Sequence, residues 1–241
     1  MIFVYPYIKG PSWWAKSGQF DELRWSIRTV EKYYKGARCV VVGDKPDFDC
    51  EHIEVPRIHI WDSCDVRHAD IIKKLTVACN EFDGFIFMYD DIYFLRNITR
   101  KDLTTPYALC RIKDLKEYNN NRGKGGLAYR HLWAETYKKV AQITDELYDW
   151  ETHLPRFFES ERVKWLIDTF DLLHNGYIIT SLYGAYFYEN PVLLDKNDTI
   201  RSHVDVMGPN IDLDKEFSRK FLVIDDNALT PSMTERIMKL I

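Results

Sequence analysis

The sequence predicts a three-layer α/β/α fold built on a mostly parallel sheet. Two mainly apolar runs, Ile2–Tyr7 and Cys39–Gly43, read as buried strands on either side of an amphipathic helix. Strand, helix, strand within about forty residues is the βαβ unit, and its repetition implies a parallel sheet covered by helices on both faces. A third apolar run, 84–89, follows another segment with helical spacing, so the alternation continues.

The first helix is supported by residue spacing and by charge. Leu23, Ile27, Val30 and Tyr34 recur at helical intervals, with acidic residues before them and lysines in the last turn. This order of charges suits the helix dipole. Gly36 is expected to end the helix.

The next elements complete the alternation. A less regular strand is expected over 52–55, and helical spacing returns over 71–80. The strand over 84–89 then leads directly into Asp90 and Asp91.

The second half of the chain is predicted to be rich in helices. A polar, glycine-rich segment over 117–126 lacks periodicity and is expected to be a loop. The remaining expected elements are helices over roughly 131–143, 159–173 and 175–187, a strand over 221–224 and a helix over 232–240.

Length and composition restrict the class of protein. The 241 residues fit one domain over 1–241, with 1–110 as a Rossmann-like nucleotide-binding core and 111–241 as a helix-rich, acceptor-side part. The net charge of −4 argues against a broad nucleic-acid surface. No stretch approaches the ~20 apolar residues that a membrane helix needs. The five scattered cysteines form no close pair, which favours a reducing cytoplasm.

Asp90 and Asp91 are the most informative residues of the sequence. In an open α/β sheet, ligands collect at the carboxyl ends of the strands, where these two acids lie. Hard cations such as Mn²⁺ or Mg²⁺ prefer carboxylate oxygens and keep positions open for phosphate. The pair therefore predicts a metal site, although Asp is also common in the turns that follow strands.

Other polar residues are candidates for binding an anionic ligand. Arg24 and Arg28 are four residues apart on the first helix, so they share a face and suit a phosphate or carboxylate, unless they form a solvated basic surface. Asp44 follows the second strand, where a uracil or ribose would bind. Lys74 lies on the helix that leads to the acid pair.

Three segments resemble a known family in order and in kind. Glu22–Val30, then Met88–Phe94, then Thr152–Pro155 are similar to the conserved blocks of the Stealth family of sugar-phosphate transferases, although Tyr89 and Leu154 replace the family's Asn and Met. The closing segment, 221–227, resembles the tail of small bacterial and phage glycosyltransferases. The resemblance implies the wider nucleotide-sugar transferase fold of the GT-A type.

The resemblance also implies roles for individual residues. Asp90 and Asp91 would hold one divalent cation, which would neutralise charge on a departing diphosphate, so Asp91 counts as catalytic. His153 would accept a proton from an acceptor hydroxyl, because an imidazole has a suitable pKa. His203 is a weaker candidate for a metal or phosphate contact.

Three functions are compatible with these residues. The first is a metal-dependent glycosyltransferase that moves a sugar from a nucleotide-sugar donor, expected to be UDP-linked, to a saccharide or other hydroxyl acceptor. The second is a sugar-1-phosphate transferase that releases a nucleoside monophosphate. The third is a non-catalytic module that binds a sugar or nucleotide. A nucleic-acid acceptor is possible, but the acidic pI disfavours it.

Overall fold

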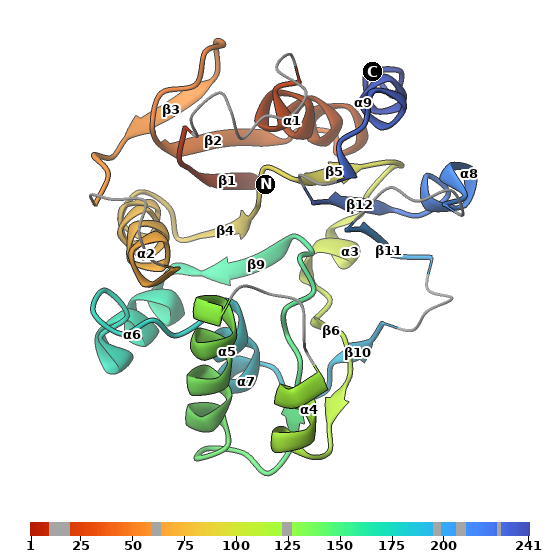
Figure 1. The fold of residues 1–241 in the computed structure, drawn as a ribbon. Helices are drawn as coiled ribbons and strands as arrows, with labels where there is room; N and C mark the ends of the chain where they lie inside the picture. The colour runs from red at the N-terminus through yellow and green to blue at the C-terminus, as the bar shows by residue number, and fades with distance from the viewer. Residues whose placement is uncertain (10–19, 59–63, 122–126, 195–198, 206–210, 226–227) are drawn as a thin grey trace.

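A computed structural model describes residues 1–9, 20–58, 64–121, 127–194, 199–205, 211–225 and 228–241 (Figure 1). In chain order the elements are β1 (Ile2–Tyr7), α1 (Glu22–Tyr33), β2 (Arg38–Gly43), β3 (Glu51–Glu54), α2 (Cys64–Glu81), β4 (Gly84–Phe87), β5 (Ile92–Phe94), α3 (Arg100–Thr104), β6 (Tyr107–Ala108), β7 (Arg111–Ile112), α4 (Leu115–Asn121), α5 (Leu127–Val140), β8 (Leu147–Tyr148), β9 (Arg156–Glu159), α6 (Ser160–Phe170), α7 (Ile179–Phe187), β10 (Val192–Leu193), β11 (Arg201–Val204), α8 (Leu213–Glu216), β12 (Phe221–Ile224) and α9 (Pro231–Met238).

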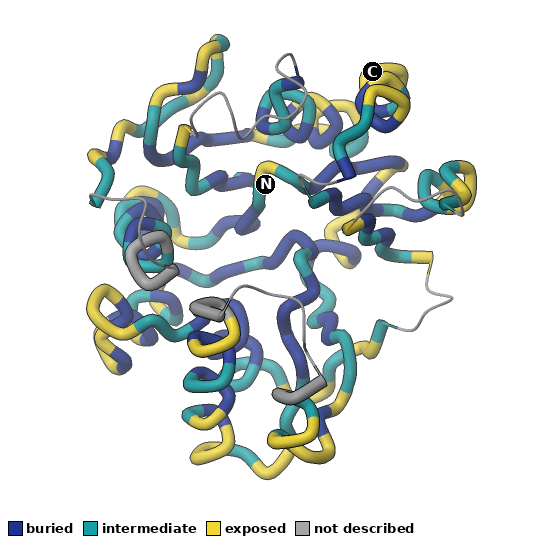
Figure 2. The backbone as a smooth tube through the Cα atoms, in the orientation of Figure 1, coloured by how far each residue is buried: buried dark blue, intermediate teal, exposed yellow. Residues whose placement is uncertain are grey.

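The central sheet has the strand order β3-β2-β1-β4-β9. The pairs β2–β3, β1–β2 and β1–β4 are parallel, whereas β9 runs antiparallel to β4. Side chains alternate across β1, so that Phe3 and Tyr5 pack with Leu23 of α1 while Val4 packs with Leu75 of α2. Figure 2 shows these strands as the buried centre of the molecule. The predicted α/β fold with a mostly parallel sheet is confirmed.

A second sheet brings the last strands back to the acid pair. Its order is β11-β12-β5, with β12 antiparallel to β5 and parallel to β11. Val223 lies opposite both Ile92 and His203 in this register. The carboxyl ends of β11 and β12 are therefore next to the start of β5, which directly follows Asp91.

Helices predominate in the second half, as the sequence predicts, with one correction. α5, α6 and α7 lie together on the side of the central sheet covered by α2 (Figure 1). The predicted loop over 117–126 is wrong in its first part, because α4 continues to Asn121; residues 122–126 are outside the described residues. Asp114 accepts a hydrogen bond from the Glu117 amide at 2.8 Å and so starts this helix.

Both halves of the chain contribute strands to both sheets. β9 belongs to the second half but completes the central sheet, and β12, which also pairs with β11, pairs with β5 from the first half. The predicted single domain over 1–241 stays a prediction. Among the described residues, no helix has the length and apolar character needed to cross a membrane.

Asp102 connects α3 to the start of β12. It forms a capping box with Thr99, and its carboxylate lies 2.5 Å from the Lys220 ammonium. We expect Asp102→Ala to lower the free energy of unfolding by about 2 kcal/mol, because a cap and a largely buried charged hydrogen bond are lost together. Urea unfolding at pH 7 measures this difference.

The effect of Asp102→Ala is expected to depend on pH. Burial would raise the pKa of the Asp102 carboxyl, but the hydrogen bonds from Lys220 and Thr99 outweigh it and lower the pKa below 3.8. A carboxyl with a depressed folded-state pKa stabilises the protein above its unfolded-state pKa, and this stability is lost as the pH falls through the folded-state value. The difference between wild type and variant should therefore shrink below about pH 3.8; a constant difference down to pH 2 would contradict this assignment.

Candidate cation and donor site

The acid pair lies where the chain leaves the central sheet and enters the second one. Met88 still extends the β1–β4 pairing, with its amide 2.9 Å from the Val4 carbonyl. Asp90 is exposed and Asp91 is half-buried. The Asp91 carbonyl accepts a hydrogen bond from the Ile224 amide at 3.3 Å, so the acid pair is adjacent to the end of β12.

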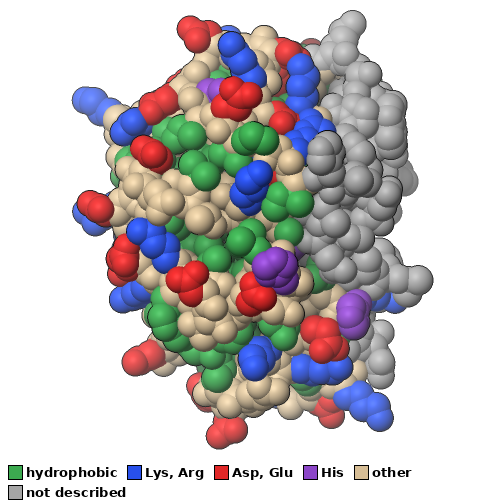
Figure 3. Space-filling view, turned by 90° about the vertical axis from the view of Figure 1, so that its left-hand side faces the viewer, with side chains coloured by type: hydrophobic (Ala, Val, Ile, Leu, Met, Phe, Trp, Pro, Cys, Tyr) green, Lys and Arg blue, Asp and Glu red, His purple; other side chains and the backbone are tan. Residues whose placement is uncertain are grey.

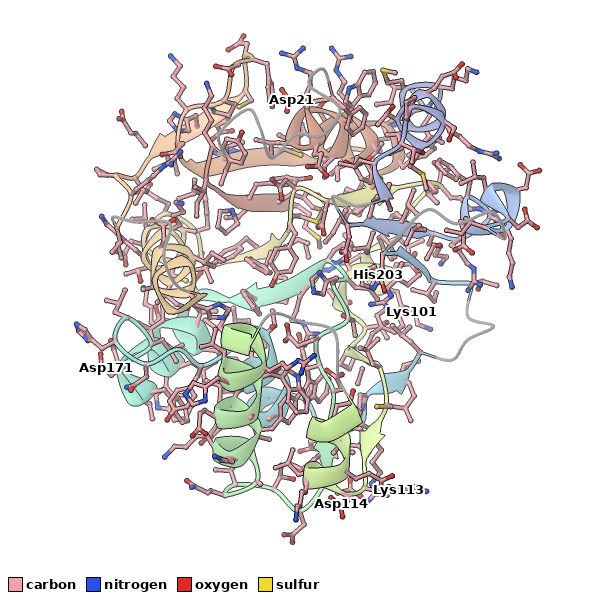
Figure 4. The ribbon with its side chains drawn as sticks, in the orientation of Figure 1. Asp21, Lys101, Lys113, Asp114, Asp171 and His203 are labelled. Carbon is pink, nitrogen blue, oxygen red and sulfur yellow. The ribbon has the colours of Figure 1, made fainter. Side chains whose placement is uncertain are left out.

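A histidine and two further acids meet at the same edge. His203 Nε2 lies 3.0 Å from Asp205 Oδ1 and 3.4 Å from Asp225 Oδ1. The potential ligand atoms of these three residues all lie within 4.8 Å of one another. Asp225 comes directly after Ile224, whose amide contacts Asp91, so this cluster and the predicted acid pair occupy neighbouring strand ends. Figure 4 shows His203 at this part of β11.

The chemistry of this donor set fits a divalent cation. Carboxylates suit Mn²⁺ or Mg²⁺, and the imidazole favours a transition metal such as Mn²⁺ over Mg²⁺. Arg201 Nη2 lies 3.3 Å from His203 Nδ1, and a guanidinium can only donate. A neutral His203 therefore carries its proton on Nε2, facing the acids. A cation bound at Nε2 requires the other tautomer, so Arg201 must release Nδ1 when the cation binds.

His153 lies between the acid pair and the cluster. Its ring stacks on Tyr89 at a centroid distance of 5.3 Å and on His203 at 5.7 Å. Its backbone is in the left-handed region, with φ of 49°. Burial lowers the pKa of His153, and this effect, with those of the neighbouring His203 and Arg201 side chains, outweighs the opposite effects of Glu151 and Asp225. The imidazole is therefore neutral at pH 7.

The two predicted arginines have different surroundings. Arg24 lies in the first turn of α1, with Nε 3.5 Å from Asp21 and its guanidinium 5.0 Å above the Phe48 ring. Arg28 is exposed one turn further along α1 and lies 5.2 Å above the Trp25 ring. Asp21 is labelled at the start of α1 in Figure 4. Arg24 is thus next to the carboxyl edge of the sheet, and a joint clamp by both arginines stays a prediction.

Asp44 and Lys74 support the end of β2. Asp44 accepts hydrogen bonds from the Lys9 amide at 2.7 Å and from Arg57 Nε at 2.5 Å. Burial would raise the pKa of Asp44, but these contacts lower it. Lys74 is fully buried and paired with Asp70. These observed contacts are structural, and the predicted donor contacts of Asp44 and Lys74 stay predictions.

A cavity of about 630 Å³ opens beside the ends of β1 and β2. Its volume is within the range of small-molecule sites. The residues that line it are Lys9, Lys45, Pro46, Asp47, Phe48, Asp49, Cys50 and His52. The sequence does not identify Phe48 as a binding residue, because a single aromatic residue in an acidic loop belongs to no periodic pattern. Tyr7 ends β1, which lies between β2 and β4 in the sheet, so Tyr7 lies between the cavity and the strand that leads to the acid pair. Burial raises the pKa of Tyr7, and the nearby Asp90 carboxylate raises it further.

Comparison with known proteins places the fold. No protein-family model matches the chain, and the comparison with curated proteins gives no significant match. A crystal structure of the galactosyltransferase LgtC, in complex with donor and acceptor sugar analogs, aligns over 100% of this chain and 95% of its own, with a TM-score of 0.51 and 12% identity. The bifunctional glycosyltransferase WbbM aligns with a TM-score of 0.44 at 11% identity, over 99% of this chain and 51% of WbbM. The chain therefore shares the fold of the glycosyltransferase LgtC.

Proposed function

We propose that this protein is a metal-dependent glycosyltransferase. It would transfer a sugar from a nucleotide-sugar donor, UDP-linked by preference, to a saccharide or other hydroxyl acceptor. The observation that carries the proposal is the His203, Asp205 and Asp225 cluster, which lies at a strand end next to the one that carries Asp90 and Asp91. These strand ends belong to a fold shared with a galactosyltransferase.

The residues at these strand ends suit the parts of such a donor. His203, Asp205 and Asp225, together with Asp90 and Asp91, would hold Mn²⁺ or Mg²⁺, which when bound neutralises charge on the departing diphosphate. The cavity beside β2 has room for the nucleoside, with the Phe48 ring available for stacking. Arg24, above that ring, supplies positive charge for a phosphate. Tyr7, at the end of β1 between β2 and β4, would line the donor between these two parts.

The net charge and the cysteines support the remaining parts of the proposal. The net charge of −4 favours a saccharide acceptor over a nucleic acid, and Figure 3 shows acidic and basic side chains interspersed on the one face that it displays. Cys39, Cys50, Cys79 and Cys110 are free thiols, which supports a cytoplasmic location.

One observation keeps the sugar-1-phosphate transferase as a second candidate. The resemblance to the Stealth family rests on separate segments, and the rings of Tyr89 and His153, from two of those segments, are stacked at 5.3 Å. The two reactions use the same donor and break different bonds. A glycosyltransferase releases the nucleoside diphosphate, whereas the phosphotransferase releases the monophosphate.

A donor screen with product analysis tests the proposal. The purified protein is incubated with a panel of UDP-, GDP- and CMP-linked sugars, with Mn²⁺ or with EDTA, and the released nucleotide is measured. We expect Mn²⁺-dependent release of UDP from a UDP-sugar, increased by added saccharide acceptors. Release of UMP from the same donor would instead support the sugar-1-phosphate transferase. Binding without turnover across the panel would favour the non-catalytic module.

A further inference from the structure

We propose that His153 is a positioning residue that holds the His203 ring in place for the cation. The inference rests on the proposed function in one respect, since it assumes that His203 contributes to a cation site. It assigns to the Thr152–Pro155 segment a role different from the proton transfer that the sequence predicts for His153.

The ring geometry supports a stacking role. Tyr89, His153 and His203 form a three-ring stack, with centroid distances of 5.3 and 5.7 Å and interplanar angles of 28° and 23°. These values are those of offset-stacked aromatic rings. Both faces of the His153 ring are therefore in contact with another ring. The stack runs from Tyr89, next to Asp90, to His203, and so connects the two groups of acids.

The Nδ1 atom of His153 is poorly placed for proton transfer. Its Nδ1 is buried and has no hydrogen-bond partner among the described residues. A base must come within hydrogen-bond reach of the proton that it removes. A buried Nδ1 and two covered faces leave only the opposite edge of the ring for any substrate. His153 makes its extensive contacts through the faces of its ring. Stacking of this kind does not require a side chain that can accept or release a proton.

The backbone around His153 is held in an unfavourable conformation. A φ of 49° is uncommon for a residue other than glycine and persists where the surroundings determine it. Arg201 donates a hydrogen bond to the Thr152 carbonyl, and the Leu154 amide donates to Thr152 Oγ1 at 3.2 Å. The fixed turn thus delivers the His153 ring between its two neighbours.

His203 gains a fixed orientation from this arrangement. It lies on β11, at the edge of the second sheet, and its side chain is 25% exposed. Arg201 contacts its Nδ1 and the acids face its Nε2. A cation at Nε2 replaces both hydrogen bonds, whereas the stacking of the His153 ring does not depend on the tautomer of His203. The His153 ring covers one face of the His203 ring and restricts its rotation. Removing a residue that orients a metal ligand typically lowers the metal affinity 10- to 100-fold.

Two substitutions separate positioning from proton transfer. His153→Asn removes the ring but keeps a polar side chain and a residue that tolerates the left-handed backbone. His153→Phe keeps a flat ring and removes both nitrogens. His174→Asn is the control, since His174 is 78% exposed and pairs with Asp171 on the surface. Thermal unfolding of each variant shows whether it is folded, and His153→Gly replaces the Asn variant if that one is not.

Mn²⁺ binding without donor is measured by calorimetry and by the electron paramagnetic resonance spectrum of the bound ion. We expect His153→Asn to weaken Mn²⁺ binding about 10-fold or more and to alter the spectrum. His153→Phe should keep most of the affinity and of the donor turnover. Wild-type affinity in the Asn variant would overturn the inference, as would a Phe variant that binds Mn²⁺ normally but has no turnover. A wild-type protein that binds no Mn²⁺ at all would instead remove the cation from the proposed function.

Discussion

The variant carrying Asp90→Asn and Asp91→Asn is expected to lose at least about 10³-fold in donor turnover. A cation that stabilises charge on a departing diphosphate contributes several kcal/mol, and each 1.4 kcal/mol is a factor of ten in rate. Asn keeps the size of the side chain and is equally suited to a turn, so the change removes charge with little effect on the local backbone. Release of nucleotide from the donor at saturating Mn²⁺ is the measurement.

The matched control is Asp168→Asn on α6, because this carboxylate is exposed and lies on a helix that contributes nothing to the sheet edge. Its turnover should equal that of the wild type. His203→Asn and Asp225→Asn should raise the Mn²⁺ concentration needed for half-maximal activity and leave the limiting rate less affected. Full turnover of the double variant, or of the wild type in EDTA, would show that the acid pair is not part of a cation site.

The first half of the fold could be predicted because each of its elements is indicated by a pattern of neighbouring residues. The apolar runs of β1, β2 and β4 and the spacing of α1 each specify one element, and the βαβ rule then supplies the parallel pairing. The helix α4 was missed although Asp114 and Glu117 have the spacing of a capping signal. The asparagines and glycines that follow favour a loop, and the whole segment was therefore predicted to be one.

The second sheet could not be predicted, because the pairing of β12 with β5 joins residues more than a hundred positions apart. The sequence shows Asp225 directly after an apolar strand, as Asp90 is after β4, but it does not show that these strand ends are neighbours. His203 was therefore only a weaker candidate, and Asp205 and Asp225 were not identified. The shared face of Arg24 and Arg28 was predicted from helical spacing, yet only tertiary packing determines that Arg24 faces the cavity loop through Phe48.

Asp70→Asn is expected to lower the free energy of unfolding by about 3 kcal/mol or more, because it leaves a buried lysine without its counter-charge. Lys74 and Asp70 have side-chain exposures of 0% and 3%. In the wild type the Ile58 amide donates a hydrogen bond to the Asp70 carboxylate at 3.0 Å. Asn still offers an oxygen to this amide, so the substitution tests the ion pair more than the backbone contact. Chemical unfolding at pH 7 gives the difference.

The same variant should have a distinctive pH dependence. Burial lowers the pKa of Lys74 in the wild type, and the hydrogen bond that Lys74 donates to Asp70 opposes this. Without the Asp70 charge the folded-state pKa falls further below the unfolded value, so the unfolded state binds more protons and stability rises with pH. The deficit of Asp70→Asn should therefore be smaller at pH 9.5 than at pH 7; a deficit that is independent of pH would contradict this origin.

Adding Lys74→Met to Asp70→Asn should restore most of the lost stability, because a buried ion pair can often be replaced by apolar groups at little cost. Lys74 packs beneath Gly43, whose φ is 136° and where an added Cβ would lie 2.6 Å from Lys74 Cε. Met fills a similar volume there and should preserve the end of β2 and the neighbouring cavity. If Lys74 only supports this region, the double variant keeps the donor affinity of the wild type. A stable double variant with weakened donor affinity would instead assign Lys74 the donor contact that the sequence predicts.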